Sequence, residues 1–141
     1  MDTFDIKDLI LRGKRAIREY EIPNIGTVVV RPLTDLEMSK GELAMLDSIK
    51  DGKTRAYMLG KTSDADDVDF NAIAEASVMS NIMIAYLAMK DFTTTPLTID
   101  QVKELPGVTG VAMFVREISG VYISKEVADA ALEEMKEFRK E

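Results

Sequence analysis

Cysteine and histidine are both absent from this sequence of 141 residues. Without cysteine the chain has no disulfide, no zinc thiolate, no iron–sulfur cluster and no thiol nucleophile. Without histidine it has no imidazole base or metal ligand and no Ser-His triad. Carboxylates, Lys, Tyr, Ser and Thr remain for catalysis, and no spacing of carboxylates singles out an acid–base pair. We therefore expect a protein that is not an enzyme and that binds no cofactor.

Positive charge is also scarce. The chain has 18 Lys and Arg against 25 Asp and Glu, a net charge of −7 at pH 7. Its only basic cluster comprises Arg12, Lys14, Arg15 and Arg18. This cluster is typical of a solvated surface, and contact with an acidic partner is the alternative. Because a protein that binds a nucleic-acid duplex usually carries a broad basic patch, we expect no nucleic-acid partner.

Long hydrophobic runs are missing as well. The most apolar segment, Val78–Met89, has twelve residues, whereas a helix that crosses a bilayer needs about 20. Near the N-terminus acids precede the apolar residues and bases follow them, the reverse of the order in a secretory signal. We therefore expect a cytoplasmic protein without a membrane partner, folded as a single domain over residues 1–141.

The first part of the chain predicts a short helix and then a β-hairpin. In residues 1–13, apolar residues recur at helical spacing from Asp5 to Arg12, and a glycine ends the helix. In residues 14–33, the strand-favouring segments 15–22 and 27–33 flank a turn. Four side chains share one face of this hairpin: Tyr20, Ile22, Val28 and Val30. Since an isolated hairpin is marginally stable, we expect it to pack on helices or on another copy, with its edge as the self-association surface.

The remainder, residues 34–141, predicts helices, so the fold class is α+β: an N-terminal hairpin followed by a mostly α-helical bundle. Capping boxes begin helices at Thr34 and Thr98. The expected helices cover residues 35–50, 54–59, 70–90, a short segment that Pro106-Gly107 ends, 108–121 and 125–139, the last capped by Ser124. The helix 70–90 is apolar around most of its circumference, so it is either the central core helix or part of an interface.

In the helix 35–50 the leucines and methionines fall on neighbouring stripes. Leu36, Leu43 and Leu46 form one apolar stripe, with Met38, Met45 and Ile49 beside it. The chain has nine methionines in all. Methionine is the flexible side chain that fills irregular core gaps and also lines surfaces that accept varied apolar partners. Both interpretations, core filling and an adaptable groove, are open for Met79 and Met83 and for Met38 and Met45.

Four aspartates, Asp64, Asp66, Asp67 and Asp69, lie within a polar segment. Such a cluster could hold a hard cation and support a small metal-dependent enzyme. In the register of a calcium-binding EF-hand, however, Val68 falls on a ligand position and Asp69 falls where the turn requires glycine. We therefore expect a solvated loop and no metal site.

The order of these segments resembles that of the tail assembly chaperones of long-tailed phages and prophages. The resemblance is strongest over residues 22–37, with Ile-Pro-Asn-Ile-Gly followed by Arg-Pro-Leu-Thr-Asp-Leu-Glu. It continues through Leu-Thr-Ile-Asp-Gln-Val-Lys-Glu-Leu at residues 97–105 and a charged closing helix. It implies a non-enzymatic factor that binds the helical tape-measure protein, keeps it soluble and helps to bring tail-tube protein to it.

The resemblance also implies a homo-oligomer that acts in the host cytoplasm during virus assembly. For the partner-binding surface we expect two apolar helices. The residues concerned are Val78, Met79, Ile82, Met83, Tyr86 and Leu87 in one helix, and Val111, Phe114, Val115 and Ile118 in the other. The alternative function is a structural virion component, such as a tail-completion or head-to-tail joining protein.

Overall fold

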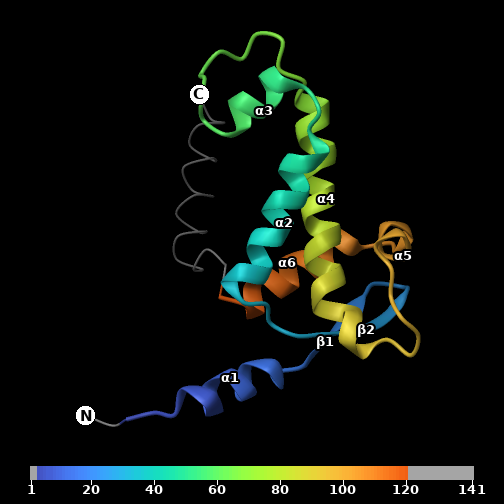
Figure 1. Ribbon diagram of the computed structural model, residues 1–141. Helices are drawn as coiled ribbons and strands as arrows, with labels where there is room; N and C mark the ends of the chain where they lie inside the picture. The colour runs from blue at the N-terminus through green and yellow to red at the C-terminus, as the bar shows by residue number, and fades with distance from the viewer. Residues whose placement is uncertain (1–2, 121–141) are drawn as a thin grey trace, which may run out of the picture.

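The computed structural model describes residues 3–120 and has the expected α+β composition. Its elements are α1 (Ile6–Lys14), β1 (Arg18–Ile22), β2 (Gly26–Val30), α2 (Asp35–Ser48), α3 (Gly52–Met58), α4 (Phe70–Met89), the 3₁₀ turn η1 (Lys90–Phe92), α5 (Ile99–Glu104) and α6 (Val108–Ile118). The helix expected over residues 125–139, with its cap Ser124, lies outside the described residues. Figure 1 shows α2 and α4 side by side, the hairpin, α5 and α6 around one end of α4, and α1 extending away from them.

Helix α4 is the centre of the core. Its second half is buried almost without interruption, at Ile82, Ile84, Ala85, Leu87, Ala88 and Met89. Helices α2, α5 and α6 and strand β2 all pack on it. Of the two interpretations that the sequence leaves open for this helix, its second half fits the central core helix, because neighbouring elements of the same chain cover most of its circumference there.

The hairpin packs its predicted face on this core. Tyr20 pairs with Val28 across the two antiparallel strands, and the Tyr20 ring lies 5.1 Å from the Phe114 ring of α6, measured between ring centroids. Both strands are shorter than the sequence predicts. Strand β2 ends at Val30 because the next amide, that of Arg31, donates its hydrogen bond to the Ala88 carbonyl of α4 instead. The hairpin is thereby joined to the central helix through the backbone.

Helix α2 begins at the predicted capping box, in which Thr34 and Glu37 satisfy each other's backbone amides. Of its two apolar stripes, the one with Met38 and Ile49 faces inward, and the leucine stripe is largely exposed. Leu36 is 75% exposed and Leu43 is 55% exposed. The opposite side packs on α4, where a Cβ at Gly41 would lie only 2.9 Å from Ile84 Cγ1. Glycine lets the two backbones approach closely at this point, and this approach decides which side of α2 faces the core.

A second close approach occurs where α5 gives way to α6. Gly107 has a left-handed φ of 79°, and a Cβ there would meet Ile22 Cγ2 of the hairpin at 2.7 Å. Only glycine combines this backbone conformation with so little space. Gly107 therefore sets how closely the α5–α6 connection packs on the hairpin.

We expect Gly107→Ala to lower the free energy of unfolding by about 2–4 kcal/mol, because both left-handed strain and steric overlap contribute. Gly60 is the matched control, since its φ of 72° is similar but nothing lies within 4 Å of a Cβ there. Gly60→Ala should cost only about 1 kcal/mol, the strain alone. Urea denaturation of both variants measures the difference. Equal losses would show that Ile22 moves aside without cost.

Candidate protein-binding surface

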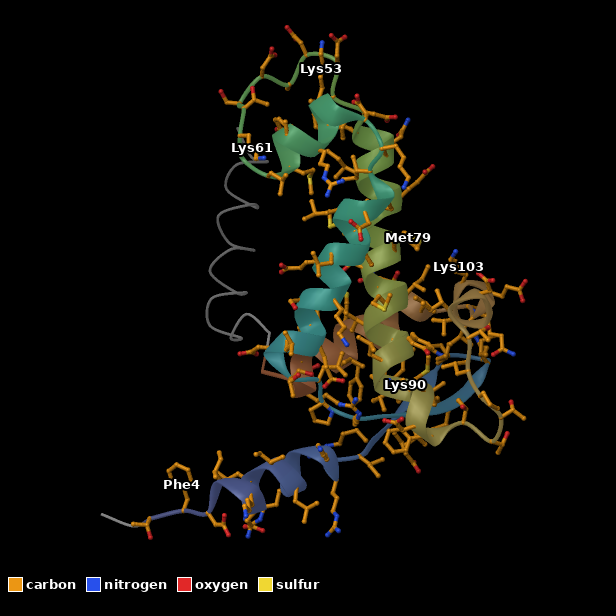
Figure 2. All side chains as sticks on the ribbon, viewed as in Figure 1. Phe4, Lys53, Lys61, Met79, Lys90 and Lys103 are labelled. Atoms are coloured by element: carbon orange, nitrogen blue, oxygen red, sulfur yellow. The ribbon has the colours of Figure 1, made fainter. Side chains whose placement is uncertain are left out.

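Helix α1 exposes its apolar face. Asp5 caps it by accepting a hydrogen bond of 2.9 Å from the Lys7 amide. The apolar stripe, defined here as Ile6, Leu9 and Ile10, is 46–59% exposed at each position, and no α1 side chain is buried. Figure 2 shows this helix, preceded by Phe4, extending away from the other elements. An amphipathic helix normally buries such a stripe, so this one offers a surface to another molecule.

The stripe continues into a hollow, which we call the arm groove. It has a volume of about 640 Å³ and lies between the last turn of α1, the segment after β2 and the turn after α4. Its apolar lining residues are Leu9, Ile10, Gly13, Pro32, Leu33 and Phe92. Its polar lining residues are Lys14, Arg31, Thr34, Glu37 and Asp91. This mixture of apolar and charged side chains suits an amphipathic occupant.

The wall of the arm groove opposite α1 is held from both sides. The Arg31 amide donates to the Ala88 carbonyl of α4 at 3.2 Å. Two residues later, the Leu33 amide donates to Ser119 Oγ at 2.9 Å, and that hydroxyl donates in turn to the Val115 carbonyl of α6. The segment between strand β2 and helix α2 is therefore tied to two core helices.

Arg31 forms ion pairs with Glu37 and Asp91, and all three residues line the arm groove. Arg31 Nη1 and Nη2 donate to the two carboxylate oxygens of Glu37 at 3.0 and 2.6 Å, and Arg31 Nε lies 3.5 Å from Asp91 Oδ2. The hydrogen bonds from Arg31 lower the pKa of Glu37 from 4.5 to about 2, and those to Glu37 raise the pKa of Arg31. A bidentate pair of this kind fixes the angle between its two segments.

The structure places the expected partner-binding residues mainly inside the chain. Ile82, Leu87, Val111 and Val115 are buried in the core. Five others are half-buried and pack against that core: Met79, Met83, Tyr86, Phe114 and Ile118. Val78 is 47% exposed. The two helices do lie together, but they face each other, so the surface that they leave for a partner is small.

The hairpin residues expected to mediate self-association are also directed inward. Ile22 and Val30 are buried, and Tyr20 and Val28 pack against the core. The methionines follow the same pattern, because Met38, Met79 and Met83 pack against the core and Met89 is buried within it. Met113 on α6, by contrast, is 62% exposed. Core filling therefore describes most of the methionines in residues 3–120.

The aspartate-rich segment is an exposed loop that begins helix α4. Asp69 caps α4, its carboxylate accepting from the Ala72 amide at 3.1 Å, and its own amide donates to Thr54 Oγ1 at 2.9 Å. Asp67 pairs with Lys53 at 3.0 Å. Within residues 3–120, no group of three His, Cys, Asp or Glu side chains is close enough to hold a metal ion.

One helical stretch of the described chain, Phe70–Phe92, is long and apolar enough to cross a membrane. It comprises α4 and η1 and is therefore longer than the apolar run counted in the sequence. About 44% of the most apolar 18-residue segment within this stretch is buried by the rest of the protein. A core helix passes the same test of length and composition.

Comparison with protein-family models, with curated proteins and with solved structures finds no significant match to this chain. The candidate surface therefore stands on its geometry. Sequence reasoning located α1 but did not identify its stripe as a surface. The available signal was the strong amphipathicity of this helix, which a basic segment separates from the hairpin. The prediction that Gly13 ends the helix is wrong, because α1 continues to Lys14 and Arg15 is its C-cap.

We expect Glu37→Gln to lower the free energy of unfolding by about 1–2 kcal/mol at pH 7, since glutamine keeps the helix cap but loses the charged pair with Arg31. Folding lowers the pKa of Glu37 to about 2, so the pair stabilises the protein fully above pH 4.5. This stabilisation is lost as the pH falls toward 2, and the difference between variant and wild type should shrink in that window. Urea denaturation at several pH values measures it.

The control is Glu42→Gln, because Glu42 is an exposed glutamate of the same helix with no salt bridge among the described residues. It should change stability by less than about 0.5 kcal/mol. A Glu37→Gln effect that stays constant from pH 7 to 2 would contradict the role given to the ion pair.

Proposed function

We propose that this protein is a non-enzymatic assembly chaperone that shields an apolar helix of a client protein. The observation that carries the proposal is the exposed stripe of α1, which leads into the arm groove. A helix that lays its apolar side chains into such a groove is a common mode of recognition. The sequence resemblance to phage tail assembly chaperones names the client as the tape-measure protein, with tail-tube protein as a further partner and the host cytoplasm as the place of action.

The charge of the chain supports a holding role. A client with repeated apolar helical faces aggregates until those faces are covered, so its chaperone must expose apolar surface and remain soluble itself. The net charge of −7 favours solubility, and the exposed stripe is confined to one short helix. The core residues around α4 need not open for the client to bind.

The test is co-expression with the long helical protein encoded nearby in the same genome. We expect the wild-type chain to keep that protein soluble and to co-purify with it, and Leu9→Asp with Ile10→Asp to abolish both effects. Because both side chains are already about half exposed, the double variant should lower the free energy of unfolding by only about 1.5–3 kcal/mol.

The matched control is Leu36→Asp with Leu43→Asp, which places the same two charges on another exposed apolar pair. It should leave client solubility unchanged. If the wild-type chain is folded and the client stays insoluble, the proposal fails. Mass spectrometry of purified particles then tests the alternative, because a virion component remains in the finished particle.

A further inference from the structure

Charge is unevenly distributed along the described chain. Residues 3–18 carry five Lys or Arg and two Asp, a net charge of +3, whereas residues 19–120 carry nine Lys or Arg and sixteen Asp or Glu, a net charge of −7. An acidic protein thus has a basic segment, and that segment bears the exposed apolar stripe.

The bases flank the stripe on both sides. At 100° per residue, Lys7 and Lys14 lie along one side of Ile6 and Ile10, and Arg12 lies along the other side. Arg12 pairs with Asp8 at 3.0 Å, an exposed pair that contributes little. In the described part of the chain, Lys7, Lys14, Arg15 and Arg18 are exposed and form no salt bridge. Of these four, Lys7 and Lys14 lie beside the stripe, so their charge is available to a molecule that lies on it.

We propose that the exposed stripe of α1 selects an amphipathic helix whose polar face is acidic. Its apolar side chains would cover Ile6, Leu9 and Ile10, and its carboxylates would reach the bases on either side of the stripe. The acidic remainder of the protein repels such a helix elsewhere, so the charge distribution also directs it to α1. This inference rests on the proposed function and names the chemistry of the client segment that binds.

Two other occupants fit the observations less well. A membrane surface is bound by amphipathic helices that are rich in bases, whereas α1 has nine residues and includes Asp8, with Asp5 as its cap. A second copy would bring like charges together if two arms met. The exposed pair Leu36 and Leu43 on another copy's α2 is flanked by Lys40 as well as by acids, so its charge is mixed. An acidic helix of a different protein satisfies both the apolar and the charged requirement.

The test uses the full chain and two synthetic amphipathic peptides of about five helical turns with the same leucine face. One carries glutamates on its polar face and the other carries lysines at the same positions. Fluorescence anisotropy should show the acidic peptide binding at least about tenfold more tightly at low salt, with the preference falling as salt screens the charges.

Charge reversal at Lys7→Glu, Lys14→Glu and Arg15→Glu should invert the preference. The matched control reverses three other exposed lysines, Lys40→Glu, Lys50→Glu and Lys61→Glu, so it changes the net charge equally and should keep the preference. Equal binding of both peptides, or no effect of the α1 reversals, would overturn the inference. So would binding to vesicles of anionic lipid without binding to either peptide, or dimerisation that the α1 reversals abolish.

Failure of this inference is distinguishable from failure of the proposed function. If the α1 charge reversals leave the client soluble and Leu9→Asp with Ile10→Asp does not, the chaperone function stands and the acidic preference is wrong. If the wild-type chain prefers the acidic peptide and yet fails to keep the client soluble, the preference stands and the chaperone function is wrong.

Discussion

The fold depends on the need to cover the second half of α4 on nearly all sides. A helix whose second half is buried from Ile82 to Met89 cannot lie on the surface of a small protein, so every neighbouring element supplies part of its cover. Helix α2 lies along its length, α6 and α5 pack on it, and strand β2 reaches it through the Arg31 amide. The hairpin, too short to be stable alone, gains its stability from this shared core.

Much of this arrangement could be predicted because its signals are local. The capping boxes at Thr34 and Thr98 depend on residues three positions apart, and both form as expected. The alternation that put Tyr20 and Ile22 on one face depends on neighbouring residues of one strand. Which of the two apolar stripes of α2 faces the core could not be predicted, because it depends on a partner. Leucine and methionine stripes satisfy the same periodicity, and the close approach of Gly41 to Ile84 selects between them.

The candidate surface was harder to predict for the same reason. An apolar helix in a core and an apolar helix at an interface have the same sequence pattern. The binding site was therefore predicted in the most apolar helices. The structure assigns most of them to the core, Val111 and Val115 fully. The stripe of α1 has an ordinary pattern, and only the positions of the other elements reveal that no other element of residues 3–120 buries it. Its basic flanks were visible in the sequence, although their relation to the stripe became evident only once α1 was placed.

A stripe of this size also limits how tightly it can hold a client. Full burial of an aliphatic side chain contributes about 1.5–3 kcal/mol, and Ile6, Leu9 and Ile10 are already about half covered, so together they contribute only a few kcal/mol. Association itself costs several kcal/mol of lost freedom, so one arm on one helix would bind weakly. Firm holding of a long client would then require several linked copies that bind its repeated faces at the same time. Weak, repeated contacts suit the proposed role, since a chaperone must be displaced when the client's own assembly partner arrives.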